Sequence, residues 1–348
     1  MKRIILIALL LLSISLQAQD TRAKLTKLIN DFKAKYPSNG LSIGVIRDDS
    51  IYYFSVGNTG NIPITEHTVF EIGSLTKSFT GLLLGLEIEK KHIDKNSFID
   101  SYLPQGVHLR PGIRRKIKMT DLGSHQSGLP NFNDDQYIMA LFKKDPEQPF
   151  RSASKAYLFQ VLEKTDTLVN HGTYAYNNYA VALLGQLLAI RSHQTYAALL
   201  KHAVLEPMHL KNTTLNDPAQ GASVAGRFDD KGDVKPAMII NAMTPAGGLH
   251  SNAIDMINFL RKQLSPSNDQ MGKAIKMSQQ TFYRDKELSV GLGWEMQNGM
   301  IEKTGDTWGN SSMLSFDPEK HVGVVVLSDH RDAQLVQDIT VAIWKEIK

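Results

Sequence analysis

Segments with strand-forming patterns lie near both ends of this 348-residue chain, and the long stretch between them is mostly helical. Strands must pair to satisfy their backbone groups, so strands from the two ends are expected to meet in one antiparallel sheet. The helical middle would then form a second lobe. The predicted strands are 41–47, 51–56, about 300–303, 313–316 and 322–327.

Helical spacing of apolar residues gives the remaining elements of the prediction. The fold class expected is α/β (α+β), an antiparallel sheet flanked by helices with a second, mostly helical lobe. The α/β lobe would comprise about 22–72 plus 286–348 and the helical lobe about 73–285, with a cleft between them. The predicted helices are about 21–36, 74–90, 155–164, 178–191, 196–204, 253–263 and 332–347.

The first 18 residues have the pattern of a signal peptide. Lys2 and Arg3 precede nine apolar residues, 4–12, which is too short for a membrane span of ~20 residues. Cleavage is expected after Ala18, leaving a single domain of 19–348. The chain has no cysteine, which excludes disulfides and lipid attachment at an N-terminal cysteine. An exported, periplasmic or secreted protein without a membrane anchor after signal removal is expected.

Composition argues against several classes of partner. The formal charge is +4, from 39 basic and 35 acidic residues, and loss of Lys2 and Arg3 with the leader would reduce it to +2. The basic cluster 110–118 lacks interleaved aromatic residues and is interpreted as a solvated face, so no nucleic acid is expected. The histidines show no close metal-ligand spacing, and neither a metal nor a cofactor is expected. His125 is interpreted as a structural histidine, with orientation of a loop near the cleft as the alternative.

The pattern Ser-x-x-Lys occurs twice, at Ser74/Lys77 and at Ser152/Lys155. The first copy opens 78–90, a segment that is apolar nearly all round and therefore predicts a buried helix. Ser74 and Lys77 are one turn apart, at the helix end where the dipole favours negative charge on the serine oxygen. The second copy lies in a polar stretch and is interpreted as a helix N-cap. Ser74 is therefore the predicted nucleophile.

A lysine acts as a base only when its pKa is lowered. Burial and a second cation, Lys303, would both lower the pKa of Lys77. Tyr176 is the other candidate base, because nearby lysine charges favour its phenolate. The sequence leaves open which of the two takes the proton of Ser74.

The string Lys303-Thr304-Gly305 lies in a segment that is predicted to be a strand rising from a turn. Lys303 offers a positive charge to a substrate carboxylate, and Gly305 lacks a side chain where an acyl group would lie against the strand. The backbone N–H groups of Ser74 and Asp306 are the expected oxyanion hole.

The order Ser-x-x-Lys, Tyr-x-Asn, Lys-Thr-Gly resembles the penicillin-recognising serine hydrolases, within them the class C β-lactamases and their penicillin-binding-protein and esterase relatives. The likeness extends from about 41 to 344 and implies a β-lactamase/transpeptidase-like fold. It also implies acylation at Ser74 and proton transfer by Lys77 and Tyr176. Asn178 would bind the substrate amide, and Lys303 with Thr304 would form a carboxylate pocket. Further matching stretches are 70–73, 124–130, 245–251 and 290–296.

Three functions fit these residues. The first is hydrolysis of β-lactams or D-Ala-type peptides through an acyl-serine intermediate. The alternative is an esterase on the same scaffold, and the second alternative is a β-lactam- or peptidoglycan-binding protein that is acylated without turnover. All three take a small-molecule or peptide substrate, and the oligomeric state is left open.

Overall fold

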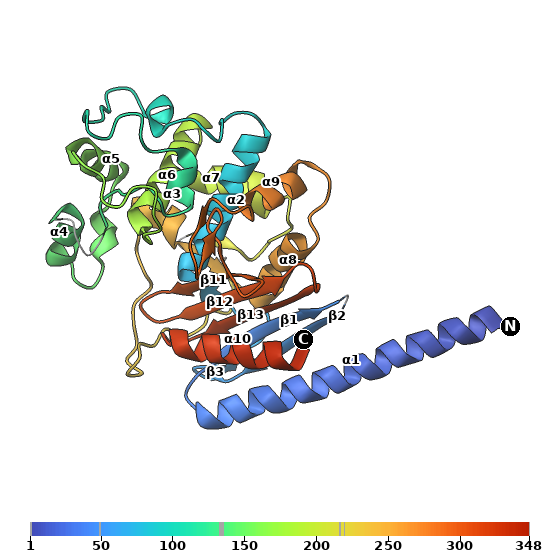
Figure 1. The fold of residues 1–348 in the computed structure, drawn as a ribbon. Helices are drawn as coiled ribbons and strands as arrows, with labels where there is room; N and C mark the ends of the chain where they lie inside the picture. Colours follow the sequence, from blue (N-terminus) through green and yellow to red (C-terminus); the bar gives the residue numbers. More distant parts are fainter. Residues whose placement is uncertain (1, 49, 132–135, 216, 219, 348) are drawn as a thin grey trace.

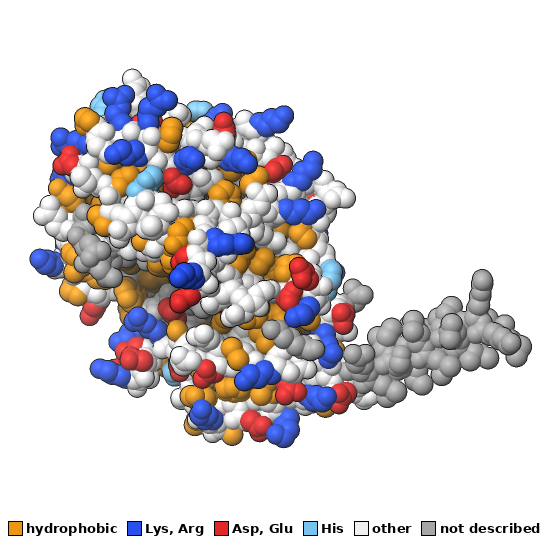
Figure 2. All heavy atoms as spheres, viewed as in Figure 1, with side chains coloured by type: hydrophobic (Ala, Val, Ile, Leu, Met, Phe, Trp, Pro, Cys, Tyr) orange, Lys and Arg blue, Asp and Glu red, His pale blue; other side chains and the backbone are white. Residues whose placement is uncertain are grey.

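The computed structural model describes residues 2–347 except 49, 132–135, 216 and 219, with side chains from residue 18 onward. A large sheet lies beneath a helical lobe, and the two terminal helices cover its outer face (Figure 1). In the described part of the chain, no helix combines the length and hydropathy that would be needed to cross a membrane. On the face in Figure 2, Lys and Arg side chains are interspersed with Asp and Glu.

The sheet has eight strands in the order β2-β1-β13-β12-β11-β10-β9-β8. The strands from the two ends of the chain pair directly, as predicted, because β1 lies antiparallel between β2 and β13. All of the pairings in this sheet are antiparallel. The strands are β1 (Leu41–Arg47), β2 (Ser50–Val56), β8 (Tyr283–Arg284), β9 (Ser289–Val290), β10 (Glu295–Gln297), β11 (Met300–Asp306), β12 (Ser311–Asp317) and β13 (Val322–Ser328).

The sheet is covered on both faces, which explains why β13 is buried along its whole length. Its side chains alternate, as the pleat of a strand requires. Val324 and Val326 pack with the terminal helices α1 (Lys2–Lys35) and α10 (Ala333–Ile347), while Val325 faces the helical lobe.

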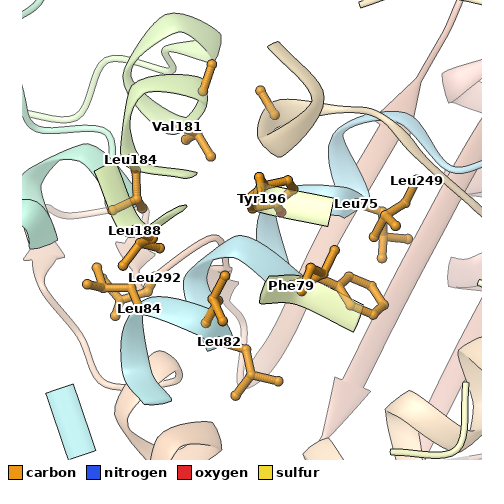
Figure 3. Packing of buried hydrophobic residues seen from close by; sticks show 14 of the residues in the cluster. Leu75, Phe79, Leu82, Leu84, Val181, Leu184, Leu188, Tyr196, Leu249 and Leu292 are labelled. Carbon is orange, nitrogen blue, oxygen red and sulfur yellow. The ribbon is translucent and has the colours of Figure 1, made fainter. Parts of the chain in front are cut away.

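The helical lobe is built around α2 (Thr76–Glu89), which is buried nearly all round, as its apolar sequence predicts. Figure 3 shows Leu84 of this helix beside Leu188 of α6. The remaining helices are α3 (Met119–Gly123), α4 (Gln136–Lys144), α5 (Lys155–Lys164), α6 (Asn178–Arg191), α7 (Tyr196–Leu200), α8 (Ala253–Leu264) and α9 (Gln270–Ser278), with short helices η1 (Gly73–Leu75), η2 (Ile99–Tyr102), η3 (Pro149–Ser152), η4 (Lys201–Leu205) and η5 (Asn241–Ala246).

Two small sheets complete the fold. In one, β7 lies between β5 and β6 and pairs with both, which brings the segment before η1 against the segment after η5. The strands are β3 (Asn58–Thr59), β4 (Ile62–Pro63), β5 (Phe70–Glu71), β6 (Thr214–Leu215) and β7 (Leu249–Ser251).

Some elements differ from the sequence-based expectation. The short strands β8, β9 and β10 extend the sheet over 283–297, where no strand is predicted, and β11 continues three residues beyond Lys303. The first helix begins at Lys2 rather than near residue 21. The expected leader, 1–18, lies almost wholly outside the residues whose side chains the structure describes.

Candidate active site

Ser74 lies in η1, immediately before α2, at the junction of the two lobes. Gly73, just before it, has a φ of +49°, and a Cβ there would lie 2.6 Å from the backbone oxygen of Asp306. Only glycine accepts both the left-handed backbone and this close approach. The predicted nucleophile is therefore placed where β11 and the start of α2 meet.

Two side chains hydrogen-bond the same oxygen of Ser74. Lys77 donates from Nζ to Ser74 Oγ at 2.8 Å, and the Tyr176 hydroxyl donates to Oγ at 2.6 Å. Lys77 is completely buried, and its Nζ also donates to the carbonyl of Ala246 at 2.6 Å. Both candidate bases thus reach the predicted nucleophile.

Two ammonium groups flank the ring of Tyr176. Nζ of Lys77 lies 4.9 Å from the ring centroid and Nζ of Lys303 lies 4.7 Å from it. Lys303 is 2% exposed and donates to Glu295 Oε1 at 2.8 Å. The hydroxyl of Tyr174 donates to the same carboxylate oxygen at 3.0 Å. The cation–π contact of Lys303 with Tyr176 therefore joins the hydrogen bonds around Ser74 to those around Glu295.

Burial and charge shift the pKa values of this network in different directions. Burial lowers the pKa of Lys77, and the charge of Lys303 acts in the same direction. Burial alone would raise the pKa of Tyr176, but Lys77 and Lys303 outweigh it and the net pKa is lowered. Burial acts to lower the pKa of Lys303, yet Tyr176 and Glu295 raise it above its ordinary value. Lys303 thus remains a fixed cation beside a more acidic phenol.

The edge of β11 faces Ser74. Pairing with β10 ends at Glu302, and the next four residues approach η1 instead. A Cβ on Gly305 would lie 2.1 Å from the carbonyl oxygen of Ile72, so the glycine is required by the protein's own backbone. This differs from the sequence-based interpretation, in which Gly305 leaves room for substrate. Thr304 is partly exposed at this edge.

The two asparagines after Tyr176 have different positions. Asn177 is the N-cap of α6, where its side chain accepts from the backbone N–H of Ala180 at 2.9 Å. Asn178 is the first residue of α6 and borders a pocket that also contains Ser74 and Asp306. The structure thus brings Asn178, rather than its neighbour, to the pocket beside Ser74.

The pocket beside Ser74 is small and largely apolar. Its volume is about 80 Å³. No Lys, Arg or Glu lines it among the residues that the structure describes. The apolar side chains that line it are Phe150, Met238, Ile240, Met243 and Ala246.

The second Ser-x-x-Lys copy has a different environment. Ser152 ends η3, and Lys155 is exposed at the start of α5. The N-cap of α5 is Ser154, which accepts from the backbone N–H of Tyr157 at 3.1 Å. Because Lys155 is exposed, this copy lacks the buried lysine that could activate a serine.

Sequence reasoning did not assign a role to Glu295 or to the carbonyl of Ala246. Glu295 lies within 290–296, a stretch that matches the resembled family, but nothing in that pattern indicates a bond to Lys303.

No group of three His, Asp or Glu side chains in the described part of the chain could hold a metal ion.

Comparison with known proteins agrees with this geometry, because residues 25–345 match the model of the family described as Beta-lactamase. The chain belongs to this family. It is similar to a beta-lactamase of Pseudomonas fluorescens, with 25% identity over 315 residues that cover 87% of this chain and 82% of that protein. It is also 25% identical over 334 residues to a beta-lactamase of Escherichia coli (strain K12), covering 83% of this chain and 84% of that protein.

A third relative has a different name. The D-alanyl-D-alanine-carboxypeptidase/endopeptidase AmpH of Escherichia coli (strain K12) is 25% identical over 315 residues, which cover 83% of this chain and 79% of that protein. Family membership confirms the resemblance, the fold class and the enzyme class predicted from the sequence, a serine hydrolase.

Proposed function

We propose that this protein is an exported serine hydrolase that cleaves β-lactams or D-Ala-type peptides through an acyl-Ser74 intermediate. The observation that carries the proposal is the pair of hydrogen bonds to Ser74 Oγ, from Lys77 at 2.8 Å and Tyr176 at 2.6 Å. A serine in contact with a buried lysine and a partly buried tyrosine, both of lowered pKa, is poised to lose its proton.

The first half of the reaction is acylation. The deprotonated member of the Lys77/Tyr176 pair accepts the proton of Ser74 as Oγ bonds to the substrate carbonyl carbon. The backbone N–H groups of Ser74 and Asp306 would stabilise the oxyanion that forms. Collapse breaks the C–N bond, and the leaving nitrogen takes the proton back from the pair.

The second half is hydrolysis of the acyl-serine ester. The same pair accepts a proton from water, the hydroxide bonds to the acyl carbon, and the ester C–O bond breaks. The proton then returns to Ser74 Oγ, and the carboxylic acid product leaves. Asn178 would bind the substrate amide, and Lys303 with Thr304 would bind a substrate carboxylate.

The test compares three substrates on one preparation. Residues 19–348 are incubated with a chromogenic cephalosporin, a D-Ala-D-Ala peptide and a short-chain p-nitrophenyl ester, beside the variants Ser74→Ala and Ser152→Ala. The proposal is supported if the protein turns over the cephalosporin or the D-Ala-D-Ala peptide, if Ser74→Ala abolishes this turnover, and if Ser152→Ala retains it. Hydrolysis that survives in Ser74→Ala would refute it.

The esterase alternative is favoured by a specific observation. The pocket beside Ser74 is largely apolar, with Asn178 and Asp306 at its lining, and has a volume of about 80 Å³, against about 150 Å³ for a cavity that binds benzene. It suits a short aliphatic acyl group. Turnover of the ester alone would favour this function. Acylation by a penicillin without turnover would instead favour the binding protein.

Export is the remaining part of the proposal. The described contacts of α1 with the body begin at Ala18 and include the hydrogen bond from Arg47 to Thr21 Oγ1 at 2.9 Å. A chain cleaved after Ala18 would lose the contact of Ala18 but keep the Arg47–Thr21 hydrogen bond and the buried residues Leu25 and Ile29. The intact mass of protein recovered from the periplasm or medium tests the cleavage position.

A further inference from the structure

The segment that carries Tyr176 has no regular secondary structure between the end of α5 at Lys164 and the start of α6 at Asn178. Its position is set by hydrogen bonds to the loop 125–130. Three backbone N–H groups of the segment donate to carbonyl oxygens of this loop: Val169 to Gly128 at 2.8 Å, Gly172 to Gln126 at 2.9 Å and Ala175 to His125 at 2.8 Å.

His125 holds both neighbours of Tyr176. The backbone N–H of Ala175 donates to the carbonyl of His125, and the backbone N–H of Asn177 donates to His125 Nδ1 at 3.1 Å. The imidazole also packs against the phenol, with ring centroids 4.6 Å apart. Tyr176, which lies between these two hydrogen bonds, therefore has little freedom to change its position.

The protonation state of His125 follows from these contacts. Since Nδ1 accepts a hydrogen bond, the neutral ring carries its proton on Nε2. His125 is 2% exposed, and among the described residues its buried Nε2 has no hydrogen-bond partner. A buried donor without an acceptor is unfavourable, so packing alone does not account for a histidine here.

The surroundings keep this imidazole neutral. Burial, followed by the charges of Lys303 and Lys77, holds the pKa of His125 well below its ordinary value. The other titratable groups that face it are Tyr176 and Tyr174, whose ring lies edge-on at 5.9 Å. Nδ1 therefore remains an acceptor at neutral pH.

We infer that His125 is a positioning residue that holds the Tyr176 hydroxyl against Ser74. The inference rests on the role of Tyr176 in the proposed function. A displaced phenol would move away from the two ammonium groups, so its pKa should rise toward the ordinary value of about 10. This effect separates positioning from a contribution to stability alone.

The experiment compares His125→Ala with His125→Asn. Asparagine keeps an acceptor near the position of Nδ1 and tolerates the φ of +60° at this residue, whereas alanine removes the acceptor. His193→Ala is the matched control, because His193 is exposed and has a similar φ of +51°. Thermal unfolding establishes that each variant is folded.

Two readouts are taken from each protein. The first is the pKa of Tyr176, from near-ultraviolet tyrosinate absorbance after subtraction of the matching Tyr176→Phe protein. The second is the pH profile of acylation of Ser74 by a fluorophosphonate. We expect His125→Ala to raise the pKa of Tyr176 and to slow acylation about 10-fold, the effect of one lost hydrogen bond. The acylation rate of His125→Asn should stay within about 3-fold of the wild-type rate.

The outcomes are distinct. An unchanged pKa of Tyr176 in folded His125→Ala overturns the inference. An equal loss of acylation rate in His125→Ala and His125→Asn also overturns it. Wild-type protein that fails to react at Ser74 refutes the proposed function instead, because the absorbance titration does not depend on activity. A similar loss in His193→Ala would also overturn the inference, by assigning the effect to the backbone conformation.

Discussion

Lys303 and Glu295 form a partly buried ion pair, with Nζ 2.8 Å from Oε1, on the strand pair β10–β11 beside the predicted nucleophile Ser74. The pair has two opposite consequences. Glu295 raises the pKa of Lys303 and so keeps a cation next to Tyr176. It also occupies one donor of the ammonium that is proposed to bind a substrate carboxylate. Lys303 thus has two possible functions, which variants can separate.

Lys303→Ala should discriminate between these functions. A charge-assisted hydrogen bond of roughly 1.5 to 3 kcal/mol corresponds to a loss of roughly 10- to 150-fold on substrates that carry a carboxylate. Uncharged esters should lose far less. The measurement is kcat/KM for a cephalosporin and for a p-nitrophenyl ester. The double variant Lys303→Ala/Glu295→Gln is the control, because it removes the carboxylate charge of Glu295 that Lys303→Ala leaves without its partner. Equal losses on both substrates would assign Lys303 to the tuning of Tyr176 and favour the esterase.

Covalent labelling should occur at Ser74. We expect a penicillin or a fluorophosphonate to add one adduct, because an activated serine is common to all three candidate functions. Intact-mass analysis followed by peptide mapping locates it. Ser152→Ala should label like wild type, and an adduct on the Ser152 peptide would contradict the assignment.

Lys77→Ala and Tyr176→Phe should each slow acylation by at least ~100-fold, the low end for loss of a general base. Both side chains contact the same Ser74 oxygen, so their effects are not expected to add. The rate of label incorporation is the measurement, with thermal unfolding to check the fold. Near wild-type rates in both variants would mean that another group accepts the proton.

The stability of the wild type relative to Lys77→Met should rise with pH. The pKa of Lys77 is lowered in the fold, so above that pKa the unfolded chain binds a proton that the folded chain has released. Stability conferred by this group therefore increases with pH until the unfolded value, about 10.4, is reached. Urea unfolding across neutral to alkaline pH measures the difference, and parallel curves for the two proteins would contradict a lowered pKa.

Met238→Ala should extend the acyl preference. Met238 is partly buried at the pocket beside Ser74, and its truncation makes room for about two further methylene groups. At ~0.8 kcal/mol each, the hexanoate-to-acetate ratio of kcat/KM for p-nitrophenyl esters should rise about 10-fold. Met271→Ala, in α9 away from this pocket, is the matched control. An unchanged ratio in Met238→Ala would mean that acyl groups bind elsewhere.

The sequence by itself determined the main elements and the reactive groups. Periodic patterns are local, so β1, β13, α2 and α6 are recognisable from residues within each segment. The three motifs likewise indicate Ser74 and Lys77 as candidate reactive groups, without any knowledge of their surroundings in the fold.

Only the tertiary structure decided how those groups act on one another. Lys77 donates to the carbonyl of Ala246, which is 169 positions away, and Tyr176 reaches Ser74 across 102 positions. The short strands β8 and β9 have too few residues to show a period, so only their pairing defines them. Burial and the distances between charges set the pKa values at the site, and both arise when remote segments pack together.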